Sequence, residues 1–186
     1  MYIPIDKVHK SSKSQYLREI LNANISLICI KYWFSLIGYI ALNMLVGRKK
    51  AKIGRNCNIH PTVIIREGQN IEIGDNCYFN HNTILTGGHN SGKLIIGNNV
   101  LTGPNVGFYV ANHHYIEKEQ LINKQGYDES DIIIGDDVWI GANSIITSGV
   151  RIGSGVVIGA NSVVTHDIPE YSIAAGVPAK IITSRK

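Results

Sequence analysis

Two adjacent histidines, His113 and His114, lie in the segment FYVANHHYIEKEQ, residues 108–120. The ordinary pKa of histidine lies near neutrality, so an imidazole can take a proton from a reacting group and return it. A neutral hydroxyl group is a poor nucleophile until a positioned base removes its proton. The pair therefore indicates acid–base chemistry, and the two residues alone leave open which histidine provides it.

A metal site at the histidine pair is disfavoured. Adjacent residues on an extended chain point to opposite sides, and no nearby cysteine or compact acidic set completes a tetrahedral site. Cys29, Cys57 and Cys77 are too scattered for a zinc motif or a disulfide framework. We expect them to be buried, reduced thiols in a reducing compartment, and we expect no metal.

The composition favours a folded, mildly basic protein. Of 186 residues, 44% are hydrophobic and 17% are charged, and 18 Lys and Arg against 14 Asp and Glu give a net charge of +4. That balance suits an acidic small molecule or a membrane surface, and no basic–aromatic motif indicates nucleic acid. The N-terminus has no apolar core after a short basic start, so we expect no cleaved secretion signal and a cytoplasmic protein.

Residues 24–47 form the most apolar stretch, and the basic run RKKAK follows them. Their length approaches the roughly 20 residues that span a bilayer, although Lys31 and Asn43 interrupt them. Three interpretations stay open: a helix packed on the protein or on a neighbouring subunit, a helix on a membrane surface, and a spanning helix. We expect residues 1–50 to be a helical segment distinct from the rest of the chain.

A six-residue repeat begins after residue 53 and is clearest in IGDDVW, IGANSI, ITSGVR, IGSGVV, IGANSV and VTHDIP. It places an aliphatic residue at Ile134, Ile140, Ile146, Ile152, Ile158 and Val164. This spacing fits neither a helix face nor an alternating strand. It predicts a coil of short strands with aliphatic side chains stacked inside, which is a parallel β-helix. Glycine recurs after the first aliphatic residue, where we expect turn conformations.

Weaker copies of the repeat come earlier in the chain, at Ile53, Ile59, Ile73, Phe79, Leu85 and Ile96. The repeat slips between Ile65 and Ile73 and again around TGGHNSGKL, and we expect loops there. We place the β-helix at residues 51–183 with a projecting loop at 108–131 and a tail at 184–186.

The segment GGHNSGKL also fits the pattern of a phosphate-binding loop. However, Leu94 stands where that loop needs a Ser or Thr to hold magnesium, and a strand-like LIIG follows in place of a helix. The segment therefore does not indicate ATP binding.

The run from IGDDVW to AAGVPAKII resembles the C-terminal half of hexapeptide-repeat acyltransferases, in particular the galactoside and maltose acetyltransferases and the O-acetyltransferases of surface polysaccharides. AAGVPAK (residues 174–180) is among its most distinctive parts, and the similarity extends over about residues 53–183. The resemblance implies a left-handed β-helix, a homotrimer with active sites between subunits, and acetyl-CoA bound between neighbouring coils.

The same resemblance implies roles for individual residues. VANHH is similar to the family loop that carries the catalytic histidine, which falls on His113, with His114 as the alternative in a shifted register. NCYFNHNT is similar to the acceptor-side segment and places Asn80 where it contacts the sugar or that histidine. An asparagine that merely completes a turn of the coil is the alternative for Asn80.

The resemblance implies binding of the acyl donor by Trp139, Ala142, Ala160, Thr165, His166 and Lys180. Two of these positions act mainly through backbone groups, whereas Lys180 can pair with a CoA phosphate. Thr183 occupies a position where relatives can have a second basic residue for the CoA phosphates. Arg185 is the candidate to replace that residue here. For Trp139, an aromatic residue at a trimer contact is an equal alternative.

The resemblance thus implies an acetyl-CoA-dependent O-acetyltransferase that acts on a sugar, such as an O-antigen unit or its lipid-linked precursor. His113 is expected to act as general base in a direct attack, because no Ser or Cys lies in a recognisable nucleophile setting. The alternatives are an N-acetyltransferase on an amino sugar or aminated small molecule, a serine acetyltransferase, and a non-catalytic β-helix scaffold. A lipid-linked acceptor favours the inner face of the membrane, with peripheral contact through residues 24–47.

Overall fold

The computed structural model describes residues 12–186, without the side chains of residues 23–25. The chain forms two compact units that meet in the sequence between Ile40 and Ala41. The N-terminal unit is helical, as expected, and the C-terminal unit is a coil of short strands.

The N-terminal unit contains the helices α1 (Lys13–Ile25) and α2 (Leu27–Ile40). Ser12 and Ser26 precede these helices and cap their N-termini, because their hydroxyl oxygens accept hydrogen bonds from the backbone N–H groups of Gln15 and Cys29, at 3.2 Å each. No residue of α2 is buried, and every described side chain of α1 is exposed. The described part of this unit therefore has no hydrophobic core of its own.

The C-terminal unit begins with the helical turns η2 (Ala41–Val46) and α3 (Gly47–Lys50). Gly47 is buried, and a Cβ atom there would collide with the backbone carbonyl of Ile65. The glycine therefore allows the helix to lie directly on the first coil and to cover its apolar end. The structure accordingly places the unit boundary before the predicted one at residue 50.

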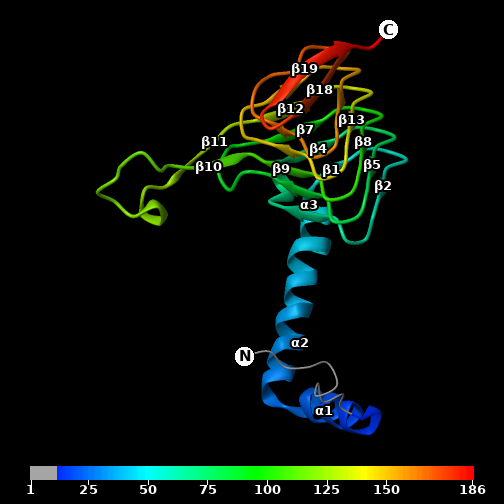
Figure 1. The fold of residues 1–186 in the computed structure, drawn as a ribbon, viewed down its shortest axis with the longest axis vertical. Helices are drawn as coiled ribbons and strands as arrows, with labels where there is room; N and C mark the ends of the chain where they lie inside the picture. The colour runs from blue at the N-terminus through cyan, green and yellow to red at the C-terminus, as the bar shows by residue number, and fades with distance from the viewer. Residues whose placement is uncertain (1–11) are drawn as a thin grey trace, which may run out of the picture. The chain divides into compact units, whose positions relative to one another are not determined.

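The strands of the C-terminal unit form three parallel sheets, and each full coil contributes one strand to each sheet (Figure 1). The first sheet consists of β1 (Lys52–Ile53), β4 (Ile71–Ile73), β7 (Leu94–Ile96), β12 (Ile132–Ile134) and β15 (Arg151–Ile152). The second consists of β2 (Asn58–Ile59), β5 (Tyr78–Phe79), β8 (Leu101–Thr102), β13 (Trp139–Ile140), β16 (Val157–Ile158), β18 (Ser172–Gly176) and the antiparallel β19 (Ala179–Ser184). The third consists of β3 (Ile64–Arg66), β6 (Ile84–Thr86), β9 (Gly107–Tyr109), β14 (Ile145–Ile146) and β17 (Val163–Val164).

The six-residue repeat is the core of this β-helix. All six aliphatic residues from Ile134 to Val164 at this spacing are at most 2% exposed. The weaker repeats place Phe79 and Leu85 in the same buried core, whereas Ile53 and Ile59 are only partly buried at the end of the coil. The predicted parallel β-helix with an N-terminal helical segment is confirmed.

The repeated glycines have a role other than the expected one. Left-handed backbone conformations at the corners belong mainly to asparagines, such as Asn143 (φ 59°) and Asn161 (φ 57°), which tolerate them well. The repeat glycine Gly135 lies instead where coils approach closely, since a Cβ atom there would be 2.6 Å from the backbone nitrogen of Ser154. Glycine is therefore needed at this position for space.

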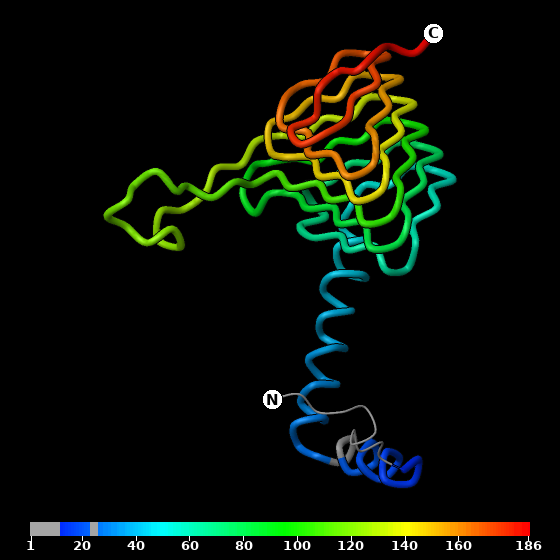
Figure 2. Tube along the Cα trace, viewed as in Figure 1, coloured from blue at the N-terminus to red at the C-terminus, as the bar shows by residue number. Residues whose placement is uncertain are grey.

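The predicted projecting loop is present, and it contains paired strands that the sequence did not indicate. Figures 1 and 2 show it extending away from the coil. β10 (Ala111–His113) pairs antiparallel with β11 (Tyr127–Glu129), so that His113 lies opposite Tyr127. A short turn, η4 (Ile122–Lys124), lies between the two strands in sequence. The candidate histidines are thus held on a β-arm.

Replacing Gly135 with Ala is expected to destabilise the β-helix by about 1–3 kcal/mol, because the added methyl group forces apart two coils that are held by backbone hydrogen bonds. Thermal unfolding measures the loss as a melting temperature lowered by several degrees. The matched control is Gly38→Ala, where a Cβ atom meets nothing within 4 Å. Equal melting temperatures for Gly135→Ala and the wild type would contradict the role in coil packing.

Candidate functional site

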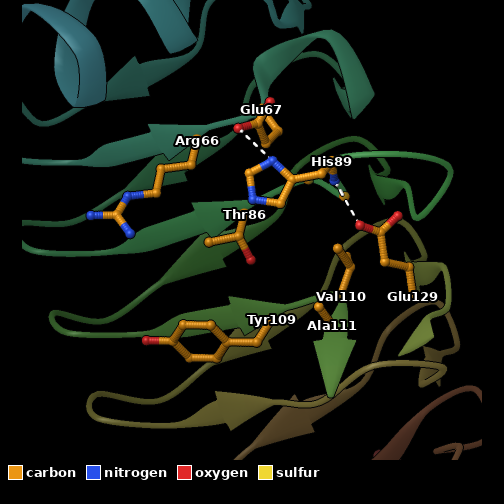
Figure 3. Close-up of a pocket in the computed structure, with 10 residues that line it drawn as sticks. Arg66, Glu67, Thr86, His89, Tyr109, Val110, Ala111 and Glu129 are labelled. Atoms are coloured by element: carbon orange, nitrogen blue, oxygen red, sulfur yellow. Dashed lines mark hydrogen bonds and ion pairs between the residues drawn. The ribbon is translucent and has the colours of Figure 1, made fainter. Parts of the chain in front are cut away.

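A pocket of about 260 Å³ lies where the strands of the third sheet end (Figure 3). Arg66, Thr86 and Tyr109 are the last residues of β3, β6 and β9 and are neighbours in register along one edge of the pocket. The loop that carries His89 and the base of the β-arm, including Glu129, complete its lining. The two places where the repeat slips, together with the base of the β-arm, therefore build a concave site whose mainly apolar lining carries a few polar side chains.

The loop from Gly88 to Gly92 wraps around the carboxylate of Glu129. Backbone N–H groups of His89, Ser91 and Gly92 donate to this carboxylate at 2.7, 2.8 and 3.0 Å, and the N–H of Asn90 donates at 3.2 Å. These donors lower the pKa of Glu129 to about 2. The segment that superficially fits a phosphate loop is thus an anion-binding nest whose occupant is a side chain of the same protein.

Aromatic contacts connect this pocket to His113. The ring of Tyr127 lies edge-on to His113, with ring centres 5.9 Å apart, and to His89, with ring centres 6.5 Å apart. His89 is held in turn by Glu67, whose carboxylate lies 3.0 Å from its Nδ1 atom. Because Glu129 lies two residues after Tyr127 on β11, the nest also fixes the strand opposite His113.

The two adjacent histidines are in different chemical situations. Both ring nitrogens of His114 face acceptors: Nε2 lies 2.8 Å from the carboxylate of Asp128, and Nδ1 lies 3.1 Å from the carbonyl oxygen of Gln125. The hydrogen bond and charge of Asp128 raise the pKa of His114. A ring that donates from both nitrogens is protonated and has no lone pair to accept a further proton.

His113 is exposed at the end of β10, and its ring makes no hydrogen bond within the described residues 12–186. A neutral imidazole there keeps one nitrogen lone pair available for a substrate proton. Of the two histidines, His113 is thus the one whose surroundings suit a general base.

Asn80 lies elsewhere on the coil, at the corner that precedes the third sheet. Its side-chain oxygen accepts the backbone N–H of His81 at 2.8 Å, so the amide does complete a turn of the coil, as the alternative interpretation held. The amide nitrogen makes no hydrogen bond within the part of the chain that the structure describes. Asn80 and His113 thus lie at opposite ends of the strands of the third sheet in one copy of the chain.

Two of the predicted donor-binding residues lie at the same corner as Asn80. Ala142 and Ala160 occupy equivalent places in adjacent coils, where the backbone N–H of Asn161 donates to the carbonyl oxygen of Ala142 at 2.8 Å. Trp139 lies just before this corner on β13 and is 52% exposed. Ala142 and Ala160 thus form a surface of small side chains beside the exposed indole of Trp139.

The other predicted donor-binding residues lie further along the coil. Thr165 follows β17, in the same row of strand ends as the pocket residue Tyr109, and its hydroxyl oxygen lies 2.8 Å from Nδ1 of His166. Lys180 is exposed on β19, opposite Ala175. A single copy of the chain therefore does not gather the predicted residues into one cavity.

Five residues of the pocket were not singled out from the sequence, nor was Tyr127, which contacts His89 and His113 beside it; the five are Arg66, Glu67, Thr86, Tyr109 and Glu129. Their positions depend on which strand end meets which loop, and spacing along the chain does not show this. The signal that could have found them is the interruption of the repeat, because Arg66, Glu67 and Thr86 lie where the repeat slips, and Tyr109 and Glu129 lie at the two ends of the projecting loop.

Similarity to known proteins places the chain in a family. Residues 131–166 match the family described as bacterial transferase hexapeptide (six repeats). Galactoside O-acetyltransferase of Escherichia coli K12 is 41% identical over 138 residues, which cover 74% of this chain and 66% of that protein. A hexapeptide-repeat acetyltransferase of Vibrio cholerae is 30% identical, with a TM-score of 0.65 over 96% of each chain. The chain belongs to the hexapeptide-repeat acetyltransferase family.

Two solved structures of relatives contain acyl donors. The Vibrio cholerae protein complexed with acetyl-CoA has a TM-score of 0.67 and 29% identity, covering 88% of this chain and 92% of that one. AntD, an N-acyltransferase from Bacillus cereus in complex with dTDP and 3-hydroxybutyryl-CoA, has a TM-score of 0.59 and 27% identity, covering 74% and 78%. The chain spans slightly less than two thirds of the length of the curated relatives it matches, 62% and 66% for two of them.

Replacing Glu129 with Gln is expected to loosen the nest, because a neutral amide oxygen is a weaker acceptor than a carboxylate. Hydrogen exchange at the amides of residues 89–92 should become faster, and the same amides should exchange faster in the wild type as the pH falls through about 2. The direction of this pH effect follows from the lowered pKa of Glu129. Its carboxylate stabilises the loop above the ordinary carboxyl pKa, and this stabilisation is lost as the group protonates in the folded protein.

The matched control for this measurement is Glu117→Gln, which removes the same charge from the distal part of the β-arm. Glu117 contacts Gln125 only through its backbone groups. Unchanged exchange at residues 89–92 in the Glu129 variant would show that the carboxylate does not hold the loop.

Proposed function

We propose that this protein is an acetyl-CoA-dependent O-acetyltransferase that acts on a sugar, with His113 as the general base. The observation that carries the proposal is the contrast between the two histidines: His114 is bonded through both ring nitrogens, whereas His113 is exposed beside the pocket. Membership of the hexapeptide-repeat acetyltransferase family and the similarity to a galactoside O-acetyltransferase support the reaction class.

In the proposed reaction, an acceptor hydroxyl oxygen attacks the thioester carbonyl carbon while His113 takes the hydroxyl proton. The tetrahedral intermediate then collapses, the C–S bond breaks, and the proton passes from His113 to the departing thiolate. The products are the O-acetyl ester and free CoA. Backbone N–H groups of the coil are proposed to stabilise the oxyanion.

The pocket beside the β-arm is proposed to hold the acceptor. Its volume of about 260 Å³ suits a single sugar ring. Arg66, Thr86, His89 and Tyr109 supply hydrogen-bond donors and acceptors around it, as recognition of hydroxyl groups requires. An O-antigen unit or its lipid-linked precursor is the proposed natural acceptor, in keeping with the predicted relation to the polysaccharide enzymes.

The acyl donor is proposed to lie along the coil past Trp139, Ala142 and Ala160, with Thr165, His166 and Lys180 toward its phosphates. The small side chains at Ala142 and Ala160 leave room for an extended chain, and the exposed Lys180 offers a cation. The structure of the Vibrio cholerae relative with acetyl-CoA supports this donor.

The surroundings of two cysteines argue against an acyl-enzyme intermediate. Cys77 is buried at 1% exposure, and burial raises the pKa of its thiol to about 11. Cys57 donates to the carbonyl oxygen of Gly74 at 3.1 Å within the same stack. A protonated, buried thiol is a poor nucleophile, so direct attack by the acceptor is the proposed route.

The separation of Asn80 from His113 supports a site that two subunits share. In one chain these residues lie at opposite ends of the third sheet, together with other predicted site residues at each end. In a cyclic trimer, the β-arm of one subunit would bring His113 to the Asn80 corner of the next. A homotrimer with its active sites between subunits is therefore part of the proposal.

N-acetyl transfer to an amino sugar is the second candidate. The carboxylates of Glu67 and Glu129 both line the pocket, and carboxylates would favour a cationic ammonium group over a neutral hydroxyl. Similarity to the N-acyltransferase AntD supports this candidate. Both carboxylates already have partners in His89 and the nest, which is why the O-acetyl reaction is preferred.

Replacing His113 with Ala is expected to lower kcat about 10²–10⁴-fold, because a general base contributes that much to proton transfer. Calorimetry should show CoA binding nearly unchanged. His114→Ala is the matched control and should keep most of the turnover, since both nitrogens of that ring are already bonded and the β10–β11 pairing still holds the arm. Normal turnover in His113→Ala would overturn the mechanism.

Mixing two inactive variants tests the shared site. His113→Ala and Asn80→Ala should each be inactive alone, and trimers assembled from equal amounts should recover about a quarter of wild-type turnover, the share of interfaces with both native residues. In mixed trimers isolated with two affinity tags the recovery should be about a third, because one of their three interfaces has both native residues. Mixed trimers without recovery would contradict a site between subunits, and an active Asn80→Ala variant would contradict the role of Asn80.

A further inference from the structure

The helix α2 exposes apolar side chains around most of its circumference. The exposed residues are Leu27, Ile28, Ile30, Tyr32, Trp33, Phe34, Ile37, Tyr39 and Ile40. At 100° per residue, its less apolar positions Lys31, Ser35 and Gly38 fall within a sector of about 60°. A helix that packs against one neighbour needs an apolar stripe of only about 100°, so α2 offers far more apolar surface than one helix contact covers.

The helix α1 adds an amphipathic surface to the same unit. Tyr16, Leu17, Ile20 and Leu21 recur at the spacing of one helix face and are 40–61% exposed. Lys13 and Arg18 are also exposed on this helix. At 100° per residue, Arg18 borders this face and Lys13 lies at its N-terminal end. An apolar face with cations at its margins is typical of helices that lie in the interface of a bilayer.

The charge of the chain is divided unevenly between its two parts. Residues 1–52 contain nine Lys and Arg and two Asp and Glu, a net charge of +7, whereas residues 53–186 contain nine and twelve, a net charge of −3. The overall charge of +4 hides this division. The positive charge thus accompanies the apolar helices in sequence, and the β-helix has the opposite sign.

The length of the apolar helix that precedes its contact with the coil distinguishes a helix that lies on a bilayer from one that crosses it. By length and composition alone, Leu27–Lys50 could cross a membrane. However, Gly47 is buried against Ile65, and Asn43 accepts a hydrogen bond from Arg66 at 2.7 Å, so the helix contacts the first coil from Asn43 onward, although Leu42 and Leu45 stay exposed. α2 itself has 14 residues and is about 21 Å long, short of a hydrocarbon core of about 30 Å.

From these observations we propose that the helical N-terminal unit binds to the surface of an anionic lipid bilayer, with α1 and α2 in the interfacial layer and the adjacent lysines at the headgroups. The all-round apolar surface of α2 favours lipid over a second copy of the chain, because a helix–helix contact would leave much of it in water. Tyr32, Trp33 and Tyr39 are of the types that lie at membrane interfaces. This binding would hold the enzyme where lipid-linked molecules are found.

Vesicle flotation of the full-length protein tests this proposal. Vesicles of phosphatidylcholine with phosphatidylglycerol should carry the protein to the top of the gradient, and vesicles of phosphatidylcholine alone should carry much less. In the Trp139→Phe variant, Trp33 is the only tryptophan, and its emission should shift to shorter wavelength with the anionic vesicles as the indole leaves water.

Charge variants make the test specific. The double change Lys49→Gln and Lys50→Gln should weaken binding to anionic vesicles by about tenfold to thirtyfold, since each cation near the surface contributes to the attraction. The matched control, Lys118→Gln with Lys124→Gln on the β-arm, removes the same charge and should bind like the wild type. Circular dichroism confirms that both variants are folded.

Three results would overturn the proposal. One is the absence of flotation with anionic vesicles. Another is equal binding by the Lys49 and Lys50 variant and the wild type. The third is Trp33 emission that is already at short wavelength without vesicles and unchanged by them, which would show that a second copy of the chain covers the helix. None of these measurements depends on acetyl transfer, so they are independent of the proposed reaction.

Discussion

The close stacking of successive coils is the constraint on which the rest of this structure depends. Each coil hydrogen-bonds through its backbone to the next, and the contact leaves no room for a side chain at positions such as Gly135. Aliphatic residues at every sixth position fill the interior in three stacks, one for each sheet, and these stacks are the hydrophobic core of the C-terminal unit. Because the strands stay in register from coil to coil, residues far apart in sequence become neighbours along strand ends.

The candidate site exists because this regular stacking is interrupted, above all by the loop at residues 88–92 and by the β-arm. At each interruption, backbone groups leave the ladder and need other partners. Glu129 provides them for the loop at residues 88–92, with a carboxylate that remains charged down to a pH of about 2. The same residue lies on the arm that carries His113, so the hydrogen bonds of one carboxylate secure both the loop and the arm.

The β-helix could be predicted because its signal is local. A spacing of six between aliphatic residues is visible in the chain from Ile134 onward, and burial of those residues confirmed it. The reason for the glycines was wrong, because close approach between coils is a property of the stack and cannot be seen within one repeat. Resemblance, and not spacing, indicated His113, and the structure adds the reason that His114 does not suit the role.

The pocket could not be predicted from the sequence, because it too is formed by residues that become neighbours only in the stack. Arg66, Thr86 and Tyr109 are separated by about 20 residues each and meet only when strand ends align. The pairing of His114 with Asp128 likewise depends on the register of β10 and β11, which the segment FYVANHHYIEKEQ does not reveal. The β-helix could therefore be predicted from the sequence, whereas the contacts between its loops could not.

The central claim is that the β-arm delivers a base to an acceptor hydroxyl at the edge of the coil. The most direct measurement is mass spectrometry of products after the protein is incubated with acetyl-CoA and matched pairs of sugars that differ by one hydroxyl or amino group. We predict addition of one acetyl group to a hydroxyl sugar, in an ester that mild alkali removes. An alkali-stable amide formed only with the amino sugars, or no acetylated product with any sugar, would contradict the account.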